Sequence, residues 1–153
     1  MKKGKKIVCK NKKAPYDYFI EEVYDAGLVL LGPEVKSLRE GRASLVDSYA
    51  KVKKGEVFLY NMHINPYPYA RYMNLDPVRT RKLLLTKREI KRLIGKTEQK
   101  GYSLIPLEVY FSGPWAKVDL ALAKGKRKID KRQAIKERDL KREMDQARKR
   151  GKD

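Results

Sequence analysis

The fold is predicted to form around one short segment, Gly32-Pro33-Glu34-Val35-Lys36-Ser37-Leu38-Arg39-Glu40-Gly41. Proline suits the first turn of a helix because its φ is fixed, so Pro33 marks a helix start. Glu34 places a negative charge in the first turn, where the helix dipole favours one. Gly41 supplies the stop. The segment therefore predicts one short helix.

The two faces of this helix differ in character. Val35 and Leu38 are three residues apart, so they point to the same side, toward a core. Lys36 and Arg39 are left facing outward. Two interpretations of the outer face stay open: an ordinary surface with solvated charges, or a rigid basic ridge that contacts nucleic acid. On either interpretation we expect the apolar pair to plug the fold.

The overall charge favours nucleic acid as the partner. The chain of 153 residues has 38 Lys and Arg against 19 Asp and Glu, a formal net charge of +19. Such an excess repels itself, and it is usually tolerated because the partner is a polyanion. An acidic membrane surface is the competing partner, but no apolar run approaches the roughly 18 residues of a spanning helix. The first 13 residues have no apolar signal-peptide core, so we expect a cytoplasmic protein.

Strand-forming segments account for most of the remaining sequence. Aromatic and β-branched runs separated by turn residues predict six strands, at 16–24, 28–31, 48–53, 56–64, 102–111 and 115–123. Thr86 and Glu89 match a capping box, which predicts the start of a second helix. The fold class is therefore mainly β: a six-stranded antiparallel barrel of the OB type with short inserted helices. The pattern alone leaves a sandwich open.

The two ends of the chain differ from the middle. We expect a basic arm over 1–13, an OB-like RNA-binding barrel over 14–123, and a basic tail over 124–153. The tail has 14 Lys and Arg against 6 Asp and Glu, and no aromatic residue. Its few apolar side chains are too little surface to offset the cost of ordering it. The tail is thus predicted to be disordered when free and helical when bound to a polyanion.

Several separated motifs, in this order, resemble one known family. They are Asn11-Lys12-Lys13-Ala14, Tyr18-Phe19-Ile20-Glu21-Glu22, Glu34-Val35-Lys36-Ser37-Leu38-Arg39, Asp76-Pro77, Arg81-Lys82-Leu83-Leu84-Leu85, Ala123-Lys124-Gly125-Lys126 and Asp130-Lys131-Arg132. The chain resembles the small protein B (SmpB) family, whose members act with transfer-messenger RNA (tmRNA, or SsrA RNA) in bacterial ribosome rescue. The resemblance runs from Asn11 to Asp139.

The resemblance implies an adaptor with two ends. The barrel would bind the tRNA-like domain of tmRNA, and the tail would engage the decoding region and the empty mRNA channel of a stalled ribosome. The implied partners are tmRNA and the ribosome, including small-subunit ribosomal RNA, with one copy of the protein in the RNA complex and no cofactor. A general ribosome-associated RNA-binding protein or RNA chaperone is the alternative.

Site residues follow only where they match the family. By resemblance, the tmRNA-binding surface contains Asn11, Lys12, Tyr18, Asp25, Leu84 and Lys117, to which the outer helix face adds Lys36 and Arg39. The two lysines at 12 and 117 would contact phosphates, and Tyr18 would either stack on a base or pack in the core. The ribosome-binding tail would use Gly125 as a hinge, together with Lys126, Asp130, Lys131, Arg132, Ile135 and Met144. Ile129 stands where the family often has an aromatic residue or histidine.

The sequence does not favour an enzyme. His63 is the only histidine, and it stands near Asn61 and Asn65, which suggests a structural hydrogen bond. The sequence offers no nucleophile with a base, no recognisable carboxylate pair and no phosphate-cradling glycine loop. Cys9 is the only cysteine, so disulfides within the chain and cysteine-based zinc sites are excluded. We therefore expect no catalytic residues and no metal.

Overall fold

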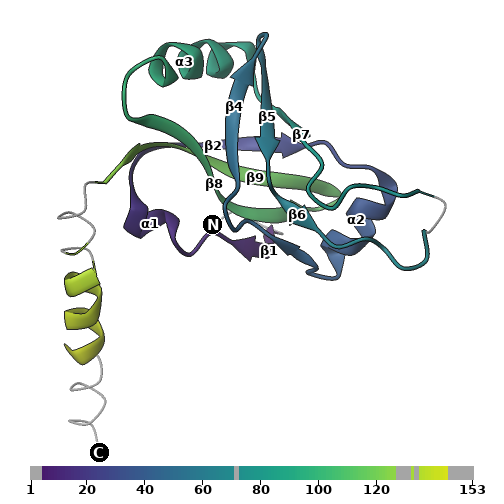
Figure 1. The fold of residues 1–153 in the computed structure, drawn as a ribbon, viewed down its shortest axis with the longest axis horizontal. Coiled ribbons are helices and arrows are strands. Elements are labelled where there is room, and N and C mark those ends of the chain that lie inside the picture. Colours follow the sequence, from purple (N-terminus) through teal and green to yellow (C-terminus); the bar gives the residue numbers. More distant parts are fainter. Residues whose placement is uncertain (1–4, 71–72, 127–131, 133–134, 145–153) are drawn as a thin grey trace, which may run out of the picture.

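Long antiparallel strands dominate the computed structural model, which describes residues 5–70, 73–126, 132 and 135–144 (Figure 1). The strands are β1 (Lys5–Lys10), β2 (Tyr18–Leu28), β3 (Ala43–Ser44), β4 (Tyr49–Lys53), β5 (Glu56–Tyr60), β6 (His63–Ile64), β7 (Arg81–Leu84), β8 (Tyr102–Ser112) and β9 (Trp115–Gly125). The helices are α1 (Ala14–Asp17), α2 (Gly32–Arg39) and α3 (Lys87–Thr97). The predicted class, mainly antiparallel β with short inserted helices, is confirmed.

Six of these strands form a ring of pairings. The large sheet has the order β1-β8-β4-β5-β7-β2-β9, and β8 also pairs with β9. Following the pairings from β8 through β4, β5, β7, β2 and β9 therefore leads back to β8. The shortest pairing in the ring joins β4 and β8, where Ala50 lies opposite Leu104. This arrangement is compatible with the predicted OB-like barrel.

β2 is one long strand where the sequence predicted two strands joined by a turn. The predicted turn at Asp25-Ala26-Gly27 is wrong, because β2 runs unbroken from Tyr18 to Leu28. Its ladder with β9 continues through Gly27 opposite Lys117, and Ala26 is fully buried in the core. Turn-forming residue types were outweighed here by burial and by pairing along the whole strand. The sixth strand of the ring is instead β7, which the sequence did not predict.

Both predicted helices are confirmed, and each contributes to the core. Leu38 of α2 is fully buried, and Val35 packs against the same cluster. At the start of α3, the Thr86 hydroxyl accepts a hydrogen bond from the Glu89 amide at 3.2 Å, and the Glu89 carboxylate accepts one from the Thr86 amide at 2.9 Å. This is the predicted capping box. Leu93 of α3 is also fully buried.

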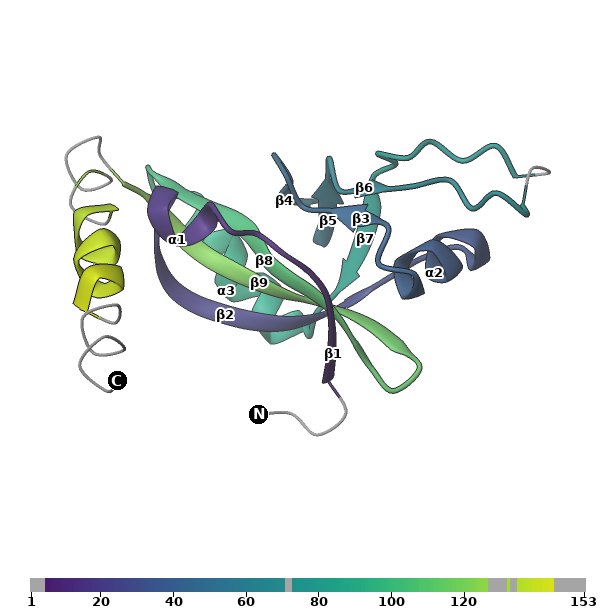
Figure 2. The ribbon, with the colours of Figure 1, turned by 90° about the horizontal axis from the view of Figure 1, so that it is seen from below.

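β2 connects two ends of the molecule. Figures 1 and 2 show α2, the tip of the β8–β9 hairpin and the loop after β6 at one end, and α1 at the other. β2 starts directly after α1 and is followed within four residues by α2. Side chains along this strand can therefore contribute to surfaces at both ends.

Residues 135–144 of the tail are helical (Figure 1). Ile135, Leu140 and Met144 are exposed on this helix, and the Arg138 guanidinium lies 4.8 Å from the ring centroid of Tyr16. The structure thus has a helical segment within the predicted basic tail. That the helix depends on a polyanion stays a prediction. No described helix is long and apolar enough to cross a membrane.

Candidate nucleic-acid interface

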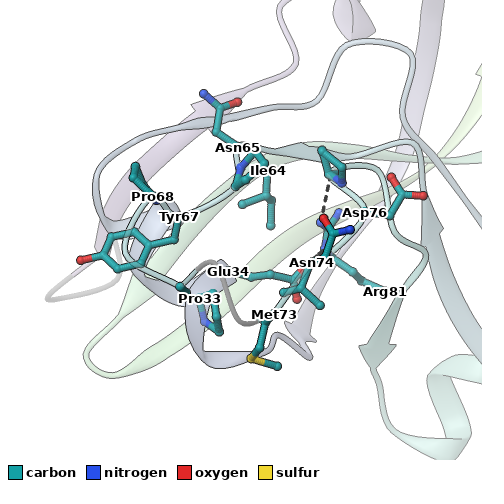
Figure 3. A pocket seen from close by; sticks show the side chains of 14 residues that line it. Pro33, Glu34, Ile64, Asn65, Tyr67, Pro68, Met73, Asn74, Asp76 and Arg81 are labelled. Atoms are coloured by element: carbon teal, nitrogen blue, oxygen red, sulfur yellow. Dashed lines mark hydrogen bonds and ion pairs between the residues drawn. The ribbon is translucent and has the colours of Figure 1, made fainter.

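A buried ion-pair cluster fixes α2 to the barrel. The Glu34 side chain is 4% exposed, and its Oε1 accepts a hydrogen bond from the Leu31 amide at 2.9 Å. Oε1 also pairs with Arg79 Nη2 at 2.5 Å, and Oε2 pairs with Arg81 Nε at 2.7 Å. Figure 3 shows Glu34 and Arg81 among the side chains that line a pocket between α2 and the loop after β6. Glu34 thus joins α2 to the segment around Arg79 and Arg81, which is distant in sequence.

Arg81 is the buried cation of this cluster. Its side chain is 0% exposed, and it also donates to the carbonyl oxygens of Met62 at 2.6 Å and Pro77 at 3.1 Å. Burial by itself raises the pKa of Glu34, but the hydrogen bonds from Arg79, the Leu31 amide and Arg81 outweigh it and hold that pKa below its ordinary value. Glu34 therefore stays ionised. Its cationic partners are Arg79 and Arg81, both of which lie outside its own helix.

The outer face of α2 carries two exposed cations near aromatic rings. Lys36 Nζ lies 5.4 Å from the ring centroid of Tyr67, and the Arg39 guanidinium lies 4.4 Å from that of Phe111. Cation–π contacts of this kind restrict where the charge can point without removing it from solvent. Lys36 and Arg39 therefore remain accessible for phosphate contacts at the rim of the barrel.

The arm groove is a hollow beside α1 that contains three of the predicted tmRNA-binding residues. Asn11, Lys12 and Tyr18 line it, and its volume is about 350 Å³. The Asn11 side chain donates to the Pro106 carbonyl at 3.1 Å and accepts from the Ala14 amide at 3.2 Å. Lys12 is exposed, whereas Tyr18 is half-buried. Asn11 therefore has a structural role in positioning α1, and Lys12 is the side chain most available to RNA.

The tryptophan groove, at the other end of β2, contains three more of them: Asp25, Leu84 and Lys117. It is lined by Asp25, Gly27, Leu28, Val29, Leu30, Leu84, Trp115, Ala116 and Lys117 and has a volume of about 470 Å³. The Asp25 carboxylate pairs with Lys117 Nζ at 3.3 Å and accepts a hydrogen bond from the Tyr110 hydroxyl at 2.7 Å. Burial, followed by this hydrogen bond, raises the pKa of Tyr110, so the phenol stays a donor. Asp25 thus positions Lys117, while Leu84 is 53% exposed.

The predicted tmRNA-binding residues therefore form two groups of three in the grooves, with Lys36 and Arg39 apart from both on α2. Tyr18 stands at the start of β2 and Asp25 near its end. None of the predicted residues lines both grooves. Trp115 lines the second groove but was not selected from the sequence. The sequence could have pointed to this residue, because Trp115 is the only tryptophan and directly follows a Ser-Gly-Pro turn.

The first tail residues belong structurally to the barrel. Gly125, the predicted hinge, ends β9 opposite Tyr18, and its amide donates to the Gly101 carbonyl at 3.2 Å. The Lys126 amide donates to the Asp17 carbonyl at 2.9 Å, and Lys126 Nζ donates to the Pro15 carbonyl at 2.9 Å. Lys126 is thus held against the barrel.

The rest of the predicted ribosome-binding set lies farther along. Ile129, Asp130 and Lys131 lie outside the described residues. Arg132 is exposed, and Ile135 and Met144 are 42% and 57% exposed. That these exposed side chains contact the ribosome stays a prediction.

The histidine has a local hydrogen bond. His63 Nε2 lies 2.7 Å from Asn65 Oδ1, which agrees with a structural role. Among the residues that the structure describes, no group of three or more His, Cys, Asp or Glu is arranged to hold a metal ion.

Comparison with known proteins identifies the family. The SmpB protein family matches residues 8–150, which include both the barrel and the tail helix. The chain belongs to the SmpB family. The SsrA-binding protein of Geobacillus kaustophilus is 57% identical over 148 residues, covering 96% of each chain. The SsrA-binding protein of Syntrophobacter fumaroxidans is 59% identical over 145 residues, covering 95% of this chain and 90% of the other.

The structural comparison agrees with the sequence. A chain of a solved structure described as "tmRNA-SmpB: a journey to the center of the bacterial ribosome" is 48% identical to this SmpB family member, with a TM-score of 0.66. The match covers 83% of this chain and 93% of that chain. The fold of this family member is thus shared with that chain.

Proposed function

We propose that this chain is a tmRNA (SsrA RNA)-binding adaptor for trans-translation on stalled ribosomes. The observation that carries the proposal is the family match over residues 8–150, together with 57% identity to an SsrA-binding protein across nearly the whole chain. The net charge of +19 supports a polyanionic partner. The proposed place of action is the cytoplasm, and the proposed role is recognition without catalysis.

The two ends of the adaptor would have separate tasks. The barrel binds the tRNA-like domain of tmRNA along a band that includes the arm groove and the tryptophan groove, with Lys36 and Arg39 at the rim. The tail engages the decoding region and the empty mRNA channel of the ribosome. Support for this division is geometric: the chain is hydrogen-bonded to the barrel as far as Lys126, and the described tail helix beyond it exposes Ile135 and Met144.

A competition experiment tests the function against the RNA-chaperone alternative. The full-length protein is incubated with labelled tmRNA and an excess of unlabelled, unrelated tRNA. We expect most of the tmRNA to remain bound, because specific contacts add to the nonspecific phosphate contacts that both RNAs offer. Displacement of tmRNA in proportion to the added tRNA would support a general RNA chaperone instead.

Lys12 and Lys117 are predicted to contact phosphates. The double variant Lys12→Ala with Lys117→Ala is expected to bind tmRNA more weakly. Its slope of log affinity against log salt concentration is expected to become shallower by about two, because two fewer counterions are released. Filter binding across a series of salt concentrations measures both quantities.

The matched control removes two lysines elsewhere. Lys87 and Lys91 are exposed on α3, outside both grooves, so Lys87→Ala with Lys91→Ala makes the same change in net charge. We expect its salt slope to stay close to that of the wild type. Equal slopes for the two double variants would remove Lys12 and Lys117 from the interface.

A further inference from the structure

The tryptophan groove brings together three exposed apolar side chains. Trp115 is 69% exposed, Leu84 is 53% exposed and Val29 is 42% exposed. The three residues come from β9, β7 and the segment after β2, and they line the same groove. An exposed apolar cluster with a polar rim is typical of a binding surface.

A glycine keeps the aliphatic side of this groove close to the backbone. A Cβ added at Gly27 would lie 3.2 Å from the Leu84 Cβ and 3.5 Å from its Cδ1. The 3.2 Å contact would force Leu84 to move by a few tenths of an ångström, whereas the 3.5 Å contact is ordinary van der Waals contact. Gly27 therefore allows Leu84 to lie close to the backbone of β2, and a larger residue would displace Leu84.

The rim of the groove supplies one oriented cation. Lys117 lines the groove with Trp115, two residues before it on β9, and its ammonium group is paired with Asp25 at 3.3 Å. Asp25 is in turn held by the Tyr110 hydroxyl at 2.7 Å. An indole and an aliphatic wall next to a positioned ammonium group match the chemistry of a nucleotide, which has an apolar base face beside an anionic phosphate.

We propose that the tryptophan groove binds one unpaired nucleobase of the RNA, stacked on the indole of Trp115 and bordered by Leu84, with Lys117 on an adjacent phosphate. Trp115 is thus a binding residue in addition to Asp25, Leu84 and Lys117. An RNA occupant is favoured over an apolar protein segment because the rim is cationic and the chain has a net charge of +19. The inference rests on the proposed function, since tmRNA is the RNA that would supply the base.

Trp115 provides its own probe, because it is the only tryptophan of the chain. The full-length protein is titrated with tmRNA while indole fluorescence is recorded, and binding is measured in parallel by filter retention. We expect the fluorescence to be quenched in step with binding, because a stacked base contacts the indole face directly.

Variants separate stacking from charge. Trp115→Ala is expected to weaken tmRNA binding about fivefold or more, the lower bound for loss of one base–aromatic stack, and Trp115→Phe by less because a ring remains. The salt slope of Trp115→Ala is expected to equal that of the wild type, since no charge is lost. Gly27→Ala is expected to weaken binding while leaving Trp115 in place. Circular dichroism confirms that each variant is folded.

Tyr69 gives a matched aromatic control. It is 82% exposed and does not line the tryptophan groove. Tyr69→Ala is expected to change tmRNA affinity by no more than about twofold, the usual range for a surface substitution away from a site.

The outcomes distinguish this inference from the function on which it rests. Failure of the wild type to retain tmRNA against competitor tRNA would overturn the proposed function. Normal tmRNA retention with unchanged indole fluorescence and unchanged affinity of Trp115→Ala would overturn only the stacking site. A fluorescence change that follows protein concentration without RNA would assign the groove to self-association and also overturn the stacking site.

Discussion

Replacement of Glu34 by glutamine is expected to lower the free energy of unfolding by about 3–5 kcal/mol, the usual cost of leaving one partner of a buried ion pair uncompensated. Arg81 is 0% exposed and Glu34 is 4% exposed, so water cannot replace the lost carboxylate charge. Arg79 loses its ionic partner in the same substitution. Urea unfolding, monitored by circular dichroism, measures the change in the free energy of unfolding. α2, β7 and the loop after β6 should loosen together, because Glu34 and Arg81 hold all three.

An exposed ion pair that also involves β7, the strand of Arg81, provides the control. Glu56 pairs with Lys82 of β7 at 3.0 Å, with side chains 49% and 41% exposed. Glu56→Gln is expected to cost no more than about 1 kcal/mol, because solvent screens an exposed pair. Equal losses for Glu34→Gln and Glu56→Gln would show that burial of the Glu34 cluster contributes nothing to stability.

Glu34→Gln should also change how the stability of the protein depends on pH. The pKa of Glu34 in the folded protein lies below its ordinary value of 4.5, so the unfolded chain binds the proton more tightly than the folded one. Its contribution to stability is therefore present above that ordinary value and is lost as the pH falls below it, toward the lower pKa of the folded state. We expect the stability difference between wild type and Glu34→Gln to narrow in that pH range.

Removal of residues 127–153 is expected to abolish peptide tagging on stalled ribosomes while tmRNA affinity stays within about twofold of the wild type, the range of changes remote from a binding site. The cut follows Lys126 because Lys126 is hydrogen-bonded to Pro15 and Asp17, and a shorter chain would lose these contacts. Both grooves remain intact in the truncated protein. Tagging is measured in a reconstituted translation system stalled on a message without a stop codon, and affinity by filter binding.

Two other results would contradict the division between barrel and tail. Tagging that persists without residues 127–153 would show that the barrel alone licenses tmRNA entry. A parallel loss of tagging and tmRNA affinity would show that the tail belongs to the tmRNA-binding surface. A full-length Met144→Ala variant tests whether the exposed face of the tail helix contributes, and its tmRNA affinity should be unchanged.

Local sequence was sufficient for several parts of the fold. Pro33 and Gly41 mark the limits of α2, and Thr86 with Glu89 marks the start of α3, because capping and dipole effects act within one helical turn. The β8–β9 hairpin followed from two apolar runs around a Ser-Gly-Pro turn. The excess of Lys and Arg indicated a polyanion, and the separated motifs indicated the family.

The tertiary structure decided how distant segments combine. Glu34 is paired with arginines 45 and 47 residues farther along the chain, and periodicity cannot specify such partners because it describes only near neighbours. The predicted turn at Asp25-Ala26-Gly27 was overridden because pairing with β9 gains more than a turn would. Leu84 and Trp115 become neighbours only when β7 and β9 pair with β2 on either side. The sequence by itself therefore determined the local elements, the charge and the family, while long-range strand register decided which exposed side chains share a groove.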